Sequence, residues 1–172
     1  MKSRFAKTAA RTTYKVGVFV DSLNLFCACR DKWHRAIDHA RLLRECVVGH
    51  ELYRAFVYGV RFKSMARWTA AVEQYGFEVK EKSPVYHTDK TDADWDSGII
   101  IDIWRMIDHI DMVVLVSGDG DFCEAVCRCQ ELGKIVRVIG VDGCVSKKLV
   151  KAADEFAPVT RDMLLTQPLQ EE

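Results

Sequence analysis

Carboxylate side chains come directly after two of the most apolar runs in the sequence. Asp21 follows the run VGVFV, and the segment SGDGD, which contains Asp119 and Asp121, follows the run MVVLV. Short apolar runs of this kind are typical of strands buried on both faces. Carboxylates crowded at the ends of such strands repel one another unless a cation lies among them. Mg²⁺ and Mn²⁺ prefer oxygen ligands, so the pattern favours a site for one of these ions.

A third acidic segment, HTDKTDADWDSG, leads into an amphipathic stretch that predicts a helix. Asp94 and Asp96 fall in its first turn and are expected to point at the same site. Asp102 lies six residues beyond Asp96, about 120° around the helix axis, so only one of the two can face the site directly. We expect Asp102 to support the metal ligands from behind or to be solvated. A single aspartate at a helix start is also explained by capping, and a DGD sequence by a turn. The metal hypothesis therefore depends on the segments occurring together.

The acidic segments need a scaffold that brings them to one place. Five short apolar runs alternate with stretches of helical spacing; the runs are 16–20, 53–58, 77–80, 112–116 and 135–141. This alternation predicts an α/β fold in three layers, with a mostly parallel sheet of about five or six strands and helices on both faces. Ligands bind such sheets beyond the carboxyl ends of the strands, where the strand order reverses. If the first and fourth runs are neighbours, the acidic segments share one crevice.

A carboxylate site of this kind is suited to phosphodiester hydrolysis. The ion binds phosphate oxygens and lowers the pKa of a bound water, and a carboxylate orients that water. Neutral hydrogen bonds would come from Asn24 and Ser117, and Lys90 could hold a phosphate. The predicted catalytic residues are Asp21, Asp96, Asp119, Asp121, Asn24 and Ser117. The four aspartates of this set are the predicted metal ligands, supported by Asp94 and Asp102.

Three segments in this order and spacing, VFVDSLNLF, KTDADWDSGIIIDI and VLVSGDGDFCEAV, resemble the NYN domain of the PIN-like nuclease superfamily, and most closely its LabA-like branch. The resemblance covers about residues 15 to 160. It implies a Rossmann-like fold and a metal-dependent ribonuclease. The acidic positions of the family fall on the four aspartates named above, and Asp102 matches a further helix aspartate. The lysine that many relatives carry three residues before Asp96 is replaced here by Ala93, and Lys90 is the nearest lysine.

RNA, single-stranded or structured, is the expected partner. Basic residues follow the second and fifth apolar runs and should lie at the same edge; they are Arg61, Lys63, Arg67, Lys147 and Lys148. Trp33, Tyr86 and Trp95 could stack on unpaired bases, although a core position is favoured for Trp95. The resemblance also allows a homodimer, since small PIN-like domains are often paired, but the sequence does not reveal the oligomeric state. A second function stays open on the same fold: a non-catalytic module that binds RNA or protein. A phosphatase is disfavoured, because Leu23 stands where the phosphoaspartate mechanism needs a second aspartate.

The bulk composition indicates one globular domain. The chain has 172 residues and a formal net charge of zero, yet its first 15 residues are basic. We expect a basic arm over 1–14, the domain over 15–165 and a tail over 166–172. The arm could be a transit peptide, a phosphate-binding segment or a solvated terminus. Since neither a secretory segment nor a membrane-spanning run is evident, we expect a cytoplasmic protein whose 7 cysteines are reduced.

Overall fold

A computed structural model describes residues 13–60, 66–82, 85–87, 90–92 and 95–169 of the protein. Its centre is a six-stranded sheet in which every neighbouring pair is parallel. In spatial order the strands are β4 (Glu78–Lys82), β3 (Glu51–Val60), β1 (Lys15–Asp21), β7 (Met112–Val116), β8 (Ile135–Gly140) and β9 (Glu155–Pro158). Within this sheet the chain order is 3-2-1-4-5-6, the doubly wound order that reverses between β1 and β7. The predicted fold class is confirmed.

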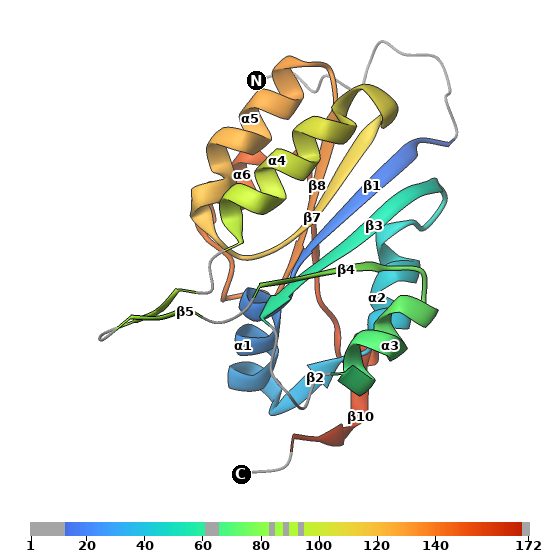
Figure 1. Cartoon of the computed structure of the whole chain (residues 1–172). Helices are drawn as coiled ribbons and strands as arrows, with labels where there is room; N and C mark the ends of the chain where they lie inside the picture. Colours follow the sequence, from blue (N-terminus) through green and yellow to red (C-terminus); the bar gives the residue numbers. More distant parts are fainter. Residues whose placement is uncertain (1–12, 61–65, 83–84, 88–89, 93–94, 170–172) are drawn as a thin grey trace.

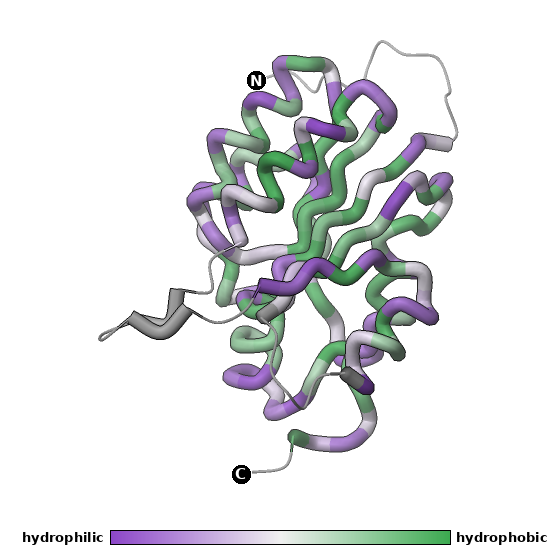
Figure 2. The backbone as a smooth tube through the Cα atoms, in the orientation of Figure 1, coloured by the Kyte–Doolittle hydropathy of each residue, from purple (hydrophilic) through white to green (hydrophobic). Residues whose placement is uncertain are grey.

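Helices cover both faces of the sheet (Figure 1). One layer contains α1 (Ser22–Trp33), α2 (His39–Cys46) and α3 (Ala66–Gln74). The other contains α4 (Asp96–Met106), α5 (Cys123–Glu131) and α6 (Lys147–Ala152). Strand side chains alternate between the two layers: Val18 and Val20 pack in the first core, whereas Phe19 packs in the second. Both faces of β1 and β7 are therefore apolar, and Figure 2 shows the central strands as the most hydrophobic part of the chain.

Smaller elements complete the described part. Two-stranded antiparallel sheets form between β2 (Arg35–Ile37) and β10 (Leu164–Pro168), and between β5 (Val85–His87) and β6 (Lys90–Asp92). Three 3-10 helices are η2 (Ile107–His109), η3 (Gly120–Phe122) and η4 (Arg161–Met163). Strand β10 extends into the segment that we expected to be a tail from residue 166. Pairing with β2 stabilises β10 through backbone hydrogen bonds. Such pairing cannot be predicted from the hydrophobic pattern of the sequence.

The predicted strands are found where the apolar runs occur, with small differences at their ends. Strand β9 had no counterpart among the runs, because its four residues, EFAP, are too short to show a pattern. No helix in the described ranges is long and apolar enough to cross a membrane.

Candidate metal centre

Strand pairing brings the ends of β1 and β7 together. Val20 is in register with Val116, so Asp21, the last residue of β1, and Ser117, the first residue after β7, lie side by side. The Ser117 hydroxyl donates a hydrogen bond to Asp21 Oδ2 at 3.1 Å. Ser117 is almost completely buried, with 1% of its surface exposed, so this bond lies away from solvent. The predicted neighbourhood of the first and fourth strand ends is confirmed.

The loop after β7 is held by hydrogen bonds from its own residues and from α1. Gly118 N donates to Asn24 Oδ1 at 2.8 Å, and Asp119 N donates to Ser117 Oγ at 3.1 Å. Asp121 N donates to Asp119 Oδ1 at 2.9 Å, which makes Asp119 the cap of η3. Asn24 and Ser117 thus position the loop that carries two of the predicted ligands.

Glycine is required in this loop because another loop packs closely against it. A Cβ on Gly118 would lie 2.9 Å from the backbone oxygen of Cys144, and Gly118 O accepts a hydrogen bond from Ser146 N at 2.9 Å. A Cβ on Gly120 would lie 2.7 Å from Ser146 Oγ. The segment between β8 and α6 therefore braces the SGDGD turn, and any larger residue at these glycines would push the two loops apart.

Three carboxylates converge beside this braced turn. Asp96, Asp119 and Asp121 each offer an oxygen, and these oxygens all lie within 4.8 Å of one another. Asp96 is in the first turn of α4, where the helix dipole favours a negative charge. Two oxygens bound to one Mg²⁺ at about 2.1 Å lie at most about 4.2 Å apart, so small side-chain rotations would bring this group onto a single ion. An all-oxygen donor set fits Mg²⁺ or Mn²⁺ and is unlike the nitrogen and sulfur sets of zinc sites.

Asp21 lies next to this group without being a member of it. Its Oδ1 accepts a hydrogen bond from Asn24 N at 3.2 Å and caps α1, and its Oδ2 accepts from Ser117. Ser117 in turn binds the backbone of Asp119, so Asp21 is connected to the three-carboxylate group through one hydroxyl. Its role as a direct metal ligand stays a prediction.

Asp102 is in a different network from the one expected for it. It is 4% exposed and accepts hydrogen bonds from Tyr58 Oη at 3.0 Å, Lys80 Nζ at 2.5 Å and Arg105 Nη1 at 3.2 Å. Burial acts to raise the pKa of this carboxyl, but the bonds from Lys80 and Tyr58 outweigh it and hold the pKa below its ordinary value. The rotation of about 120° along α4 turns Asp102 toward β3 and β4. Its support of the metal ligands stays a prediction.

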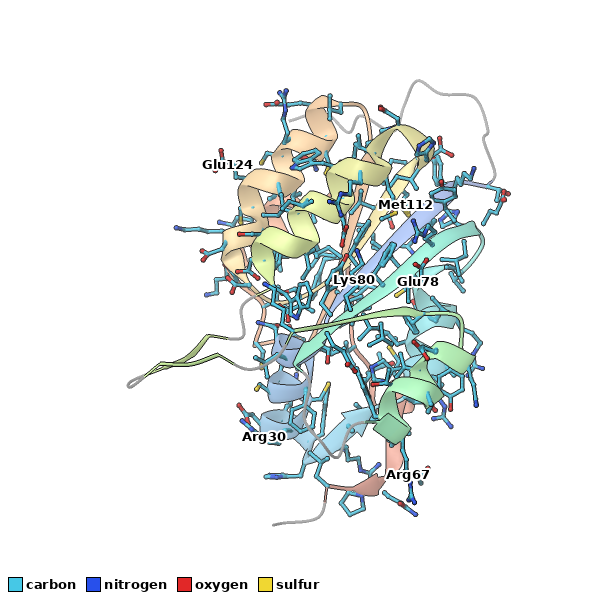
Figure 3. All side chains as sticks on the ribbon, in the orientation of Figure 1. Arg30, Arg67, Glu78, Lys80, Met112 and Glu124 are labelled. Atoms are coloured by element: carbon cyan, nitrogen blue, oxygen red, sulfur yellow. The ribbon has the colours of Figure 1, made fainter. Side chains whose placement is uncertain are left out.

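The structure describes only some of the basic residues that were predicted to bind RNA. Arg61 and Lys63 lie outside the described residues, as does the side chain of Lys90. Asp94, predicted to support the metal ligands, also lies outside them. Arg67 is exposed near the start of α3, in the helix layer opposite α4 (Figure 3). Lys147 and Lys148 are exposed in the first turn of α6, directly after the segment that braces the SGDGD turn. These two lysines are therefore the predicted phosphate contacts that the structure places next to the carboxylates.

Two of the three aromatic residues proposed to stack on bases are described. Trp33 is half-buried, with Lys32 Nζ 5.1 Å from its ring centroid. Trp95 is also half-buried, and its Nε1 donates to Gly59 O at 2.8 Å, which anchors the start of α4 to β3. The side chain of Tyr86 lies outside the described part of the chain.

A cleft of about 570 Å³ opens beside the carboxylates between α4 and α5. Asp121 lies in its wall, together with Trp104 from α4 and Glu124 from α5. Sequence reasoning missed this cleft, because it is formed by residues of two helices whose relative position is set by packing. Only the helical spacing of α4 hinted that some of its apolar residues would be left at the surface, as Ile101 is.

Comparisons with known proteins agree with this geometry. The NYN domain profile matches residues 15–162. The "Low amplitude and bright protein LabA" of Synechococcus elongatus is 27% identical over 154 residues, which cover 83% of this chain and 82% of that protein. A crystal structure of a protein of unknown function from Vibrio parahaemolyticus is 30% identical, with a TM-score of 0.84 over 92% of this chain and 100% of the other.

Proposed function

Because the chain belongs to the NYN domain family, a PIN-like nuclease family, we propose that it is a metal-dependent ribonuclease that hydrolyses RNA phosphodiester bonds. The observation that carries the proposal is the convergence of Asp96, Asp119 and Asp121, from two separated segments, to within 4.8 Å at the edge where the strand order reverses. Such a group is costly to assemble without a cation, and its oxygen ligands suit an ion that binds phosphate.

Each residue near the group has a role in this proposal. Asp96, Asp119 and Asp121 would hold Mg²⁺ or Mn²⁺, which activates water and stabilises the charge on the phosphate oxygens. Asn24 and Ser117 hold the SGDGD turn in place, and Asp21 orients Ser117 through the bond to its hydroxyl. Lys147 and Lys148 would contact the RNA backbone. RNA as substrate is part of the proposal, whereas the homodimer and the cytoplasmic location stay predictions.

Cleavage of RNA is the direct test. The purified full-length protein is incubated with labelled single-stranded, duplex and structured RNAs, with Mn²⁺, with Mg²⁺, and with a chelator. We expect products in the presence of metal and none with the chelator, because the carboxylates need the cation to bind and activate the scissile phosphate. Absence of cleavage on every RNA and metal combination would contradict the proposed activity. Binding of RNA without cleavage would instead support the non-catalytic module.

Metal binding is tested separately by thermal unfolding. An ion that binds only the folded protein raises Tm, and at an ion concentration 100 times Kd the stabilisation is about 2.7 kcal/mol. For a chain of this length that corresponds to a rise of about 5–10 °C. We expect this rise with Mn²⁺, and we expect it to be lost in Asp121→Asn. The variant Asp108→Asn is the control, since Asp108 is an exposed carboxylate in η2 at the other end of α4. An unchanged Tm at millimolar Mn²⁺ would exclude a metal site.

A further inference from the structure

The face of β3 and β4 that looks toward α4 is only partly covered. In the described part of the chain, α4, α5 and α6 lie over β1, β7 and β8 (Figure 1). Beyond α4 the sheet has a hollow of about 390 Å³ that is lined by Arg54, Phe56 and Lys80 from the strands and by Asp102 and Arg105 from the helix. Figure 3 shows Lys80 and Glu78 on this part of β4. The hollow is therefore formed by charged and aromatic residues on an open sheet face.

This surface, which we call the β3–β4 strip, has an excess of positive charge. Its cations are Arg54, Lys80, Lys82 and Arg105, and its carboxylates are Glu78 and Asp102. Both carboxylates are already neutralised within the strip: Glu78 Oε1 accepts from Arg54 Nε at 2.6 Å, and Asp102 accepts from Lys80 and Arg105. Asp102 is also buried, so it adds little negative potential at the surface.

The side chains of Arg54, Lys80 and Arg105 are exposed enough to reach a ligand. The Arg54 guanidinium has five N–H donors, its bonds to Glu78 come from Nε and Nη2, and its side chain is 45% exposed. Lys80 uses one of three donors on Asp102 and has a side chain 33% exposed. The side chain of Arg105 is 71% exposed. A polyanion could therefore bind here without breaking the bonds that stabilise the strip.

Aromatic rings lie between these cations. Arg54 Cζ is 4.8 Å and Lys80 Nζ is 5.0 Å from the centroid of the Phe56 ring. Lys82 Nζ is 4.3 Å from the centroid of the Trp95 ring. Trp95 is half-buried, and so is Tyr53 at the other end of the hollow. Phe56 is itself buried, so the ring surface open to a ligand comes from Trp95 and Tyr53. Cations beside such rings are typical of grooves that bind single-stranded nucleic acid, where phosphates meet the cations and bases pack on the rings.

The strip is continuous with the metal centre. Trp95 directly precedes Asp96, and its ring lies 5.3 Å from that of Tyr58, which in turn bonds Asp102. Asp96 and Asp102 are on the same helix, about 9 Å apart along its axis at 1.5 Å per residue. An RNA strand bound at the three carboxylates would therefore contact Lys82 and Trp95 first and the hollow next.

We propose that the β3–β4 strip is the binding surface that guides single-stranded RNA to the carboxylate centre. The inference rests on the proposed function and adds where the substrate lies. Duplex RNA is excluded from this role, because its bases are stacked inside the helix and cannot pack on Trp95 or Tyr53. The strip thus selects unpaired RNA next to the bond that is cut.

The test is a binding measurement in the Asp119→Asn background with Mn²⁺ present. Fluorescence anisotropy of a labelled single-stranded RNA is compared between that protein and one that also carries Arg54→Gln and Lys82→Gln. We expect binding at about 0.1 M salt to weaken by about tenfold. The plot of log binding constant against log salt concentration has a negative slope, and its magnitude should decrease by about 1.4, since each lost phosphate contact contributes about 0.7 for a single strand.

The matched control carries Arg44→Gln and Arg161→Gln, two exposed arginines in α2 and η4. This control removes the same charge outside the strip and should retain affinity and salt slope. Equal losses in both double variants would show a general charge effect and overturn the proposal, as would an unchanged affinity in the strip variant. If wild type cleaves RNA while the strip variant binds normally, the strip is rejected and the ribonuclease is retained.

A second measurement needs no substitution within the strip. Single-stranded RNA containing 4-thiouridine is photo-crosslinked to the otherwise unaltered Asp119→Asn protein, and the crosslinked peptides are identified by mass spectrometry. We expect crosslinks within β3, β4 and at Trp95. Crosslinks confined to α1, α2 and α3, or no RNA binding at all, would overturn the proposal.

Discussion

Replacing Asp119 with asparagine should abolish metal-dependent RNA cleavage and leave the fold intact. Asp119 contributes one of three carboxylates that lie within 4.8 Å of one another, and an amide is a much weaker ligand for Mg²⁺ or Mn²⁺. Loss of the ion from its position removes several kcal/mol of transition-state stabilisation, which corresponds to a fall in kcat/KM of about a thousandfold or more. The measurement is cleavage of single-stranded RNA in Mn²⁺.

The fold of this variant should survive because asparagine can replace the structural role of Asp119. The bond that caps η3 runs from Asp121 N to Asp119 Oδ1, and the asparagine side-chain oxygen can accept it as well. We therefore expect Tm without metal to stay within about 2 °C of wild type. Asp108→Asn is the control and should cleave at the normal rate. A wild-type rate in Asp119→Asn would show that the assignment of this residue is wrong.

Replacing Asp102 with alanine should cause a large loss of stability. Asp102 accepts bonds from Tyr58 and Lys80, and removing it leaves the hydroxyl of Tyr58 and an ammonium group without that partner. Tyr58 is fully buried, so water cannot readily replace the lost bond. Unsatisfied buried groups of this kind cost about 1–3 kcal/mol, and we expect a fall of about 2–3 kcal/mol in the free energy of unfolding. Urea denaturation at pH 7 measures it.

The matched variant is Asp108→Ala, which removes an exposed carboxylate near the end of the same helix and should change stability by less than about 0.5 kcal/mol. A similarly small effect of Asp102→Ala would contradict the importance of the network. The variant would then show that Lys80 and Tyr58 find other partners.

The contribution of Asp102 should also depend on pH in a defined direction. Its pKa in the folded protein lies below the ordinary value, so the folded state favours the ionised form. The stabilisation is therefore fully present above the ordinary pKa of about 3.9 and is lost as pH falls through the lower folded-state value. We expect the stability difference between wild type and Asp102→Asn to be constant from pH 5 to pH 8 and to narrow below about pH 4. A difference that grew on acidification would contradict this sign.

The fold class could be predicted because it depends on local patterns. Runs such as MVVLV are apolar on both faces, which only a strand between two layers can bury, and helical spacing separates the runs. The order of the central strands followed from general rules of parallel sheets, and the pairing of β1 with β7 confirmed it. The meeting of Asp21 with Ser117 followed in turn, since Asp21 ends β1 and Ser117 directly follows β7.

Which carboxylates form the close group was decided by side-chain positions, which no spacing rule supplies. Asp21 lies at the end of β1 and Asp119 in the loop after β7, yet the close group includes Asp119 and not Asp21, which caps α1 and bonds Ser117. Asp102 illustrates the same limit on α4. Its place in the sequence predicted a position near the ligands, but its bonds to Tyr58 and Lys80 depend on how α4 packs against β3 and β4.

The sequence by itself determined the layers of this protein, the edge at which its acidic segments gather and the family to which it belongs, because each is encoded in short contiguous patterns. Only the tertiary structure decided how residues far apart in the chain combine there. Arg54 on β3 bonds Glu78 on β4, and Lys82 on β4 lies over the ring of Trp95, which directly precedes α4. Such contacts depend on the packing of whole elements, so the β3–β4 strip is visible only in the folded molecule.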